Sequence, residues 1–326
     1  MTKGLEDLTV PDNAGADPAA APAEPAAVSA EPAVAEPKPS PAPARAPVKR
    51  ALLIGCNYVG SRVQLAGCKN DTLAMAEVVA GFWQGAGETH WLLDPPNAEA
   101  DPRPTKANIL AELAWLTGDL VAGDQLFLYY SGHGKQVADT SGDEADGKDE
   151  ALVPLDYVTA GVLTDDELGT ALLAKVPAGA RLTIIIDACH SGTVLDLPHR
   201  YYCNSITKDG KKPRKPYNFA DWTSDTREST EAALVAHYAQ SGSIVFISSS
   251  QDEQTSASTI MAVDNKYAYR GAFTTSLITS LKENNFNIKN KYLLKEANCR
   301  LWIIGMAQRA LLSSTTPALL DEPFVI

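Results

Sequence analysis

The chain of 326 residues is poor in cysteine and in positive charge, and it has no long hydrophobic run. Its five cysteines are an odd number without metal-ligand spacing, which suggests neither a disulfide framework nor a zinc site and fits a reducing compartment. Lys and Arg number 28 against 40 Asp and Glu, a net charge of −12, so we expect no nucleic-acid partner. The start of the chain lacks the apolar core of a signal peptide, and no later stretch could span a bilayer. These absences predict a cytoplasmic location without membrane contact.

The N-terminal segment, residues 1–48, lacks aromatic residues and consists mostly of Ala, Pro and Glu. Such a composition cannot bury enough apolar surface to fold. We interpret this segment as a disordered, partly polyproline-like arm, which could be a pro-segment, a docking tail or a mere spacer. The remaining residues, 49–326, suffice for one domain with an ample core.

Strand-like and helix-like segments alternate along residues 49–326. Short apolar runs predict strands over 49–56, 91–93, 125–131, 151–155, 181–187, 243–248 and 322–326. Helical spacing predicts helices over 70–82, 106–116, 272–282 and 292–312, and Thr164 with Glu167 forms a capping box for another. The acidic stretch 139–149 and the polar stretch 198–231 predict exposed loops. This alternation predicts an α/β fold with a mostly parallel central sheet, flanked by helices on both faces.

An imidazole and a thiol follow two of the predicted buried strands. His133 lies in YSGHG (130–134) and Cys189 in DACHSG (187–192). Ligand crevices of parallel sheets lie beyond the carboxyl ends of the strands, and a base beside a thiol favours the nucleophilic thiolate. The pair therefore predicts nucleophilic catalysis, in preference to a small core cysteine and an ordinary loop histidine.

A polar residue lies two positions before each of these two residues, on the same side of its strand. Asp187 and Cys189 are two residues apart, as are Ser131 and His133, so each pair shares a side. An unpaired carboxylate at the end of an apolar strand is costly to bury unless a cation visits it. We therefore favour a cation-binding role for Asp187 over a simple hydrogen bond to a neighbouring loop.

The chain resembles the metacaspases, which are caspase-like cysteine peptidases. The matching segments are ALLIGCNY (51–58), LAGCKND (65–71), YSGHG (130–134), DACHSGT (187–193) and SSSQDEQTSA (248–257). The resemblance covers roughly 49–326 and is closest to type I members, although the arm lacks the zinc-finger cysteines that some of these carry. It implies a caspase-like fold with a larger part (49–200), an exposed linker (201–242) and a smaller part (243–326).

The resemblance also implies roles for individual residues. Cys189 would be the nucleophile and His133 the acid/base partner, while the N–H groups of Gly134 and Cys189 would form an oxyanion hole. The family cleaves after Arg or Lys, so the substrates would be proteins or peptides that carry these residues before the scissile bond. The residues that match its acidic specificity pocket are Asp71, Asp187, Ser131 and Cys68. No organic cofactor is implied, and we expect a monomer.

Calcium is the usual activator of the family, and the matching acids are Asp149, Asp165, Asp166 and Asp196. Spacing alone does not predict this site, because residues 143–150 do not fit an EF-hand loop and runs of acids are usually solvated surface. The helix cap explains Asp165 and Asp166 without a metal.

The basic run KDGKKPRK (208–215) has the chemistry of the substrates that the family prefers. On an exposed loop it would invite self-processing of a zymogen at Lys208, Lys211, Lys212, Arg214 or Lys215, or behind the arm at Arg45, Lys49 or Arg50. An unprocessed solvated loop is the alternative.

Three functional hypotheses follow from these residues. The leading one is a calcium-stimulated cysteine endopeptidase that acts in proteolysis linked to programmed cell death, as the resemblance implies. The second is a catalytically silent caspase-like scaffold, which would predict a missing Cys, His or pocket acid. The third is another peptidase of the clan, legumain-like or paracaspase; the acidic loop and Asp71 argue against the former, and the Pro-rich arm without an immunoglobulin-like segment against the latter.

Overall fold

The computed structural model describes residues 45–139, 147–189, 191–192, 194–195, 197–203, 222–226, 241–250, 258–263 and 266–326. Most of the predicted arm (1–48), the basic run 208–215 and Asp196 lie outside this part of the chain. The folded unit extends over Pro47–Ile326.

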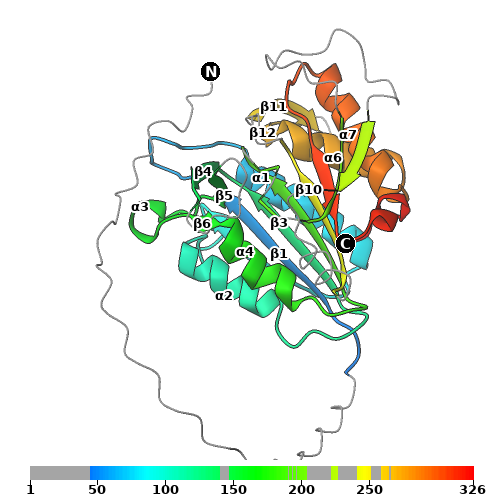
Figure 1. Cartoon of the computed structure of the whole chain (residues 1–326). Helices are drawn as coiled ribbons and strands as arrows, with labels where there is room; N and C mark the ends of the chain where they lie inside the picture. Colours follow the sequence, from blue (N-terminus) through cyan, green and yellow to red (C-terminus); the bar gives the residue numbers. More distant parts are fainter. Residues whose placement is uncertain are drawn as a thin grey trace, which may run out of the picture. The chain divides into compact units, whose positions relative to one another are not determined.

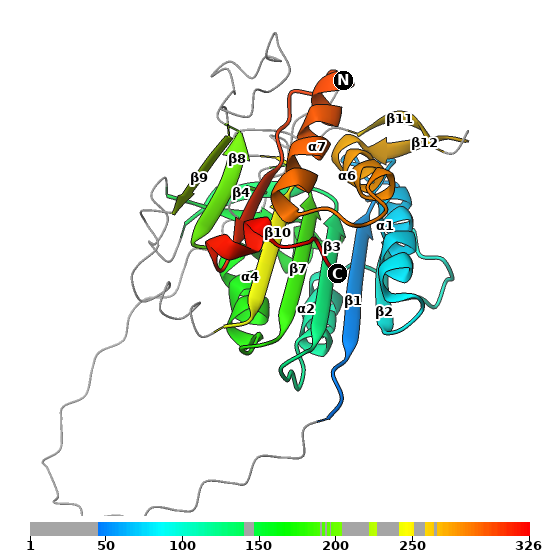
Figure 2. The same cartoon turned by 90° about the vertical axis from the view of Figure 1, so that its right-hand side faces the viewer.

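Eight strands form the central sheet in the order β2-β1-β3-β7-β10-β13-β8-β9 (Figures 1 and 2). Their bounds, in this order, are Glu88–Asp94, Lys49–Cys56, Gln125–Ser131, Arg181–Asp187, Ser243–Ser248, Leu311–Ser314, His199–Cys203 and Trp222–Thr226. Strands β2, β1, β3, β7 and β10 are parallel, whereas β13, β8 and β9 extend the sheet with antiparallel pairings. The predicted parallel sheet is confirmed, and the antiparallel extension is an addition that the sequence pattern did not reveal.

Helices cover both faces of the sheet, as predicted (Figure 2). One face packs against α1 (Cys68–Trp83), α6 (Ala272–Glu283) and α7 (Asn290–Ile303), whose buried side chains include Met75, Phe273 and Leu293. The other face packs against α2 (Lys106–Leu116) and α4 (Asp165–Leu172) through residues such as Leu113 and Leu168. Consecutive strand residues such as Leu52 and Leu53 enter opposite cores, so the sequence of β1 is a continuous apolar run.

Two smaller β-structures lie outside the main sheet. Strands β4 (Gly134–Ala138), β5 (Lys148–Leu152) and β6 (Leu163–Thr164) form an antiparallel sheet, and β11 (Ser258–Val263) pairs with β12 (Lys266–Gly271). The short helix α3 (Tyr157–Ala160) and the 3-10 segments η2 (Leu173–Lys175) and η4 (Pro317–Asp321) complete the described elements. The predicted capping box of α4 is present, because the side chain of Thr164 accepts from the Glu167 N–H and the Glu167 side chain accepts from the Thr164 N–H.

The predicted exposed linker 201–242 is wrong in two places. Strand β8 reaches into it, with Tyr201 and Cys203 buried, and β9 lies wholly within it. These two strands pair with each other and, through β13, join the central sheet. Short strands of mixed polarity lack a two-residue alternation long enough to be recognised, so only their tertiary pairing defines them.

The C-terminal predictions are also corrected. The helix predicted over 292–312 ends at Ile303, and Leu311–Ser314 is strand β13. Gly305, at φ +89°, follows the last turn of α7 in the conformation typical of a glycine that ends a helix. The closing strand predicted over 322–326 is absent from this described segment, where η4 is followed by an extended chain with one isolated bridge, Lys289 to Pro323.

The predicted loop 139–149 is wrong at its end. Asp149 is buried within β5 and lies opposite Val137 of β4. Residues 140–146 lie outside the described part of the chain. Strand β5 also starts three residues before the strand predicted at Ala151.

Candidate active site

The backbone of His133 is clamped by two buried tyrosines. Its N–H donates to the Tyr58 hydroxyl over 3.0 Å, and its carbonyl accepts from the Tyr130 hydroxyl over 2.9 Å. The Tyr58 hydroxyl donates in turn to the Val153 carbonyl over 2.6 Å, and the centroids of the Tyr58 and His133 rings lie 4.8 Å apart. Both backbone polar groups of His133 are satisfied, so the loop that follows β3 holds the histidine in one place.

The imidazole of His133 makes a contact that assigns its tautomer. Its Nε2 lies 2.8 Å from the Val63 carbonyl, which can only accept a hydrogen bond. Nε2 therefore carries the proton, and Nδ1 of the neutral ring is the atom that can accept one. Burial lowers the pKa of His133, and the bond to Val63 partly offsets this effect, so the neutral base is favoured.

Cys189 lies two residues beyond the end of β7, is partly exposed and is not in a disulfide. Its backbone carbonyl is close to Gly134, where an added Cβ would lie only 2.0 Å from the Cys189 oxygen. Glycine is therefore required at position 134 for the two segments to approach. This proximity brings together the predicted catalytic segments at the carboxyl ends of the neighbouring strands β3 and β7, which pair through Ser131 and Asp187.

The two predicted pocket carboxylates meet on either side of Gly271. Both oxygens of Asp71, in the first turn of α1, accept from the Gly271 N–H at 2.9 and 2.8 Å. Asp187 Oδ2 accepts from the Thr274 hydroxyl at 2.7 Å and from its N–H at 3.3 Å. A Cβ on Gly271 would lie 2.4 Å from an oxygen of Asp187 and 2.9 Å from one of Asp71. The junction of β12 and α6 thus holds the acids together, although no local signal marked Gly271 or Thr274.

The environment of these carboxylates favours an added positive charge. Burial and the charge of Asp187 raise the pKa of Asp71 well above its ordinary value, while the Gly271 N–H and the charge of Arg270 act in the opposite direction. Cys68 lies in the same region, where burial raises the pKa of its thiol and a hydrogen bond with Ser131 lowers it. All four predicted pocket residues are therefore brought together: Asp71, Asp187, Ser131 and Cys68.

Three of the predicted calcium acids also gather. Asp149 of β5 is buried, and Asp165, the first residue of α4, accepts from the N–H groups of Glu150 at 3.1 Å and Asp166 at 2.8 Å. Burial, with the charges of Asp149 and Asp166, raises the pKa of Asp165 to about 7. Carboxylate oxygens suit a hard cation, and their mutual repulsion would be relieved by one. Within the part of the chain that the structure describes, no group of three His, Cys, Asp or Glu residues has metal-binding geometry.

The processing positions predicted behind the N-terminal arm differ in their surroundings. Arg45 precedes β1, whereas Lys49 and Arg50 are its first two residues. The Arg50 guanidinium donates to the carbonyls of Trp115 and Gly118 at 3.0 and 2.7 Å, so this side chain is engaged by α2 and the turn that follows it.

The fold and the placement of the thiol and imidazole define the class as caspase-like: a mostly parallel sheet with the two catalytic residue types beyond adjacent strands. Residues 49–198 match the family model for the metacaspase peptidase C14 domain. Residues 49–198 therefore form a peptidase domain of the metacaspase family, which confirms the resemblance seen in the motifs.

Individual relatives agree with this assignment. Metacaspase-1 of Coccidioides immitis is 44% identical over 161 residues, which are 49% of this chain and 35% of the relative. Metacaspase-1B of Neurospora crassa is 35% identical over 257 residues, which are 72% of this chain and 59% of the relative. A crystal structure of protein GSU0716 from Geobacter sulfurreducens superposes with a TM-score of 0.56 at 26% identity, covering 86% of this chain and 99% of that one. The chain spans less than two thirds of the length of these two curated metacaspases.

One further observation concerns membranes. Among the residues that the structure describes, no helix has both the length and the apolarity to cross a bilayer.

Proposed function

We propose that the chain is a calcium-stimulated cysteine endopeptidase that cleaves after Arg or Lys. The observation that carries this proposal is the pair of buried carboxylates, Asp71 and Asp187, beside Gly271 and next to the loops that hold His133 and Cys189. A site with a nucleophile but no anionic pocket would not select substrates with a basic side chain. An anionic pocket without the thiol would bind a basic side chain but would not cleave the peptide bond.

Each proposed catalytic step uses an atom of the site. Nδ1 of His133 takes the thiol proton, and the Cys189 thiolate attacks the carbonyl carbon of the scissile bond. The C–N bond breaks as the imidazolium returns the proton to the leaving amine, which leaves a thioester on Cys189. Water then attacks the thioester, releasing the acid product and the thiol. The Cys189 and Gly134 N–H groups would stabilise the oxyanion in both tetrahedral intermediates.

The preference for Arg or Lys would follow from the buried negative charge of Asp71 and Asp187. Burial, and after it the repulsion between the two carboxylates, raises the pKa of Asp71. A guanidinium or ammonium group would relieve that repulsion and replace the lost hydration. An Asp side chain would add a third negative charge, so the pocket should reject it.

The acids of β5 and α4 would contribute to the calcium site, although among the described residues they do not by themselves have metal-binding geometry. Asp149, Asp165 and Asp166 would supply carboxylate oxygens to the ion, with Asp196 as the fourth predicted ligand. Burial is the main cause of the raised pKa of Asp165, and bound calcium would favour its ionised form and offset the added repulsion from Asp149 and Asp166. Strand β5 pairs with β4, which begins at Gly134, so the proposed ion site is one strand away from the catalytic loop.

Self-processing remains a separate part of the proposal. The basic run 208–215 lies between β8 and β9, whose ends Cys203 and Trp222 are paired. Incubating the purified chain with calcium and mapping new termini by mass spectrometry tests it. New termini after Lys or Arg within 208–215 are expected, and an intact wild-type chain that cleaves peptide substrates would refute processing without affecting the peptidase proposal.

The decisive assay measures fluorophore release from two peptides that differ only in the residue before the fluorophore, Arg or Asp. Wild type and C189A are each tested with calcium and with chelator. We expect calcium-dependent release from the Arg peptide by wild type alone. Release by C189A would refute the nucleophile, and preference for Asp would refute the pocket. An inactive wild type would instead favour a non-catalytic scaffold.

A further inference from the structure

Three buried serine hydroxyls converge on one backbone carbonyl next to the nucleophile. Ser191, Ser249 and Ser250 donate to the Ala188 oxygen at 2.8, 3.1 and 3.0 Å. All three serines are 0% exposed. A carbonyl oxygen has two lone pairs, so three hydroxyl donors exceed what it needs for satisfaction. Such a concentration of donors on the residue directly before Cys189 suggests a role beyond burial of one polar group.

The serines come from two segments that the parallel sheet brings together. Ser191 follows Cys189, whereas Ser249 and Ser250 follow β10, which pairs with β7. The N–H of Ser249 donates to the Ile186 carbonyl at 2.9 Å, continuing that pairing beyond the strands. Ser248 connects the two segments, because its hydroxyl lies 3.0 Å from that of Ser191 and donates to the Ser250 carbonyl. The serine cluster, defined as these four residues, is therefore held by the rigid centre of the sheet.

Fixing the Ala188 carbonyl also fixes the Cys189 N–H. The two groups belong to one planar trans peptide, in which the C=O and N–H bonds point in opposite directions. With the carbonyl directed into the serine cluster, the N–H must point away from it. Hydrogen bonds to the carbonyl oxygen also polarise the peptide, which makes its N–H a stronger donor.

We infer that Ser191, Ser249 and Ser250 are positioning residues that aim the Cys189 N–H at the oxyanion of the proposed peptidase reaction. The inference rests on the proposed function, because it concerns the same oxyanion hole. The bond to the oxyanion forms only as the substrate carbonyl becomes tetrahedral, so losing its alignment lowers kcat rather than raising KM. Removing an oxyanion donor outright costs about 100- to 1000-fold in kcat. A misaligned donor should cost part of that, about tenfold or more.

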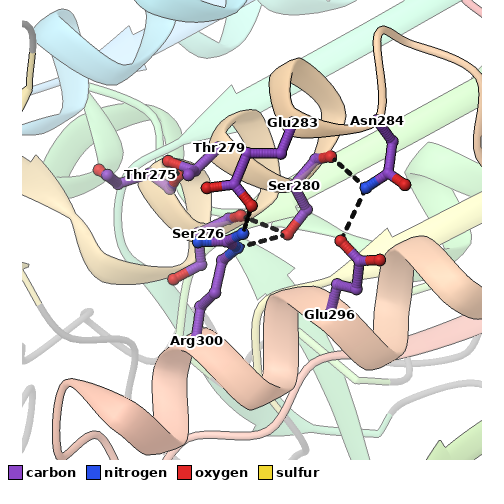
Figure 3. A network of polar contacts seen from close by, with 8 residues as sticks. All are labelled: Thr275, Ser276, Thr279, Ser280, Glu283, Asn284, Glu296 and Arg300. Carbon is purple, nitrogen blue, oxygen red and sulfur yellow. Dashed lines mark hydrogen bonds and ion pairs between the residues drawn. The ribbon is translucent and has the colours of Figure 1, made fainter.

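The test compares S249A, S250A and the S249A/S250A double variant with wild type on the Arg peptide. The double variant should lose about tenfold or more in kcat, with KM within about twofold of wild type, and each single variant should lose a smaller part. The matched control is S280A. Ser280 is also a 0% exposed serine, but it lies on α6 in the polar network of Figure 3, where it donates to Ser276 and accepts from Arg300. S280A should lower thermal stability and leave kcat unchanged.

Two chemical probes separate positioning from folding. Iodoacetamide alkylates a thiolate without forming an oxyanion, so the rate at Cys189 should be unchanged in the serine variants. A peptide aldehyde ending in Arg forms a hemithioacetal whose oxygen occupies the hole, so its inhibition constant should rise with the loss of kcat. If the double variant does not fold, kcat and the aldehyde inhibition constant of the single variants S249A and S250A test the inference.

Unchanged kcat and aldehyde affinity in folded S249A and S250A would overturn the inference while the peptidase proposal stands. A parallel fall in kcat and in alkylation rate would overturn it as well, because the serines would then support the thiol and not the oxyanion hole. Wild type that fails to cleave the Arg peptide would count against the proposed function itself; the alkylation rate then still reports whether the thiol is reactive.

Discussion

The close approach of Gly134 to Cys189 makes a quantitative prediction for G134A. The added Cβ would lie 2.0 Å from the Cys189 oxygen, and real Cβ contacts essentially never fall below 3.0 Å, so the atoms must separate by at least 1 Å. The other nearest atoms, Cys189 C at 3.2 Å and Ala188 Cβ at 3.3 Å, leave little room on the same side. A misplacement of about 1 Å in a catalytic site costs about 100-fold in rate, equivalent to about 2.7 kcal/mol in the barrier. We therefore expect kcat/KM for the Arg peptide to fall about 100-fold or more.

The assay needs a control that adds the same methyl group where there is space. G81A is suitable, because Gly81 lies in α1 and an added Cβ there meets no atom within 4 Å. It should leave kcat/KM unchanged and stabilise the helix by about 0.5–1 kcal/mol. Thermal unfolding of both variants shows whether G134A remains folded, with overpacking expected to cost about 1–3 kcal/mol. Folded G134A with kcat/KM within threefold of wild type would refute the requirement for close approach.

Three further predictions test other parts of the site. Y58F removes the acceptor of the His133 N–H, and leaving this buried donor unsatisfied costs about 1–3 kcal/mol. We expect kcat to fall about tenfold or more in Y58F and to stay unchanged in the control Y157F. Equal kcat in both variants would refute the role of Tyr58 in holding the His133 backbone. Asp71 must be ionised to bind a cation and its pKa is raised, so kcat/KM of the wild type for the Arg peptide should fall as the pH drops through that raised pKa. The D71N variant should raise KM about 30-fold or more. A pH profile and a KM of D71N identical to those of wild type would contradict this prediction. Calcium should raise the unfolding temperature more at pH 8 than at pH 6, because protons compete with the ion for Asp165 near its pKa of about 7. The D165N variant should abolish this difference, whereas the control E99Q should keep it. An equal rise at both pH values would remove the support for Asp165 as a ligand.

The raised pKa values also set a sign for the pH dependence of folding. A carboxyl group whose pKa is higher in the folded chain binds protons more tightly there than in the unfolded chain. Asp71 and Asp165 therefore each make the calcium-free chain less stable as the pH rises from the ordinary carboxyl range through their raised pKa values. This expectation runs opposite to the usual one for ion-paired carboxylates, and chemical unfolding at several pH values measures it.

Local patterns predicted the elements that carry their own signal. The apolar runs of β1, β3, β7 and β10 are long enough to be recognised, because strands buried on both faces need few polar residues. The capping box at Thr164 depends on residues three apart and was predicted from them alone. Strands β8, β9 and β13 were missed or placed in the wrong element, because they are short and depend on pairing with distant strands.

The candidate site divides in the same way. His133 and Cys189 could be identified because each follows a recognisable strand, and the pocket acids because they match motifs of a known family. Tyr58, Gly271 and the serine cluster had no such signal as functional residues. Tyr58 acts on a histidine 75 positions later, and Gly271 holds a carboxylate 200 positions earlier.

The sequence by itself therefore determined the parallel sheet, the thiol and imidazole at its carboxyl edge and the family to which they point, because periodicity and motif order are local properties. Only the tertiary structure decided how these groups are held: the tautomer of His133 through Val63, the meeting of Asp71 with Asp187 across Gly271, and the direction of the Ala188–Cys189 peptide through three serines. The physical reason is that hydrogen-bond geometry and burial depend on distances in space, and here these join residues that are up to 200 positions apart in the chain.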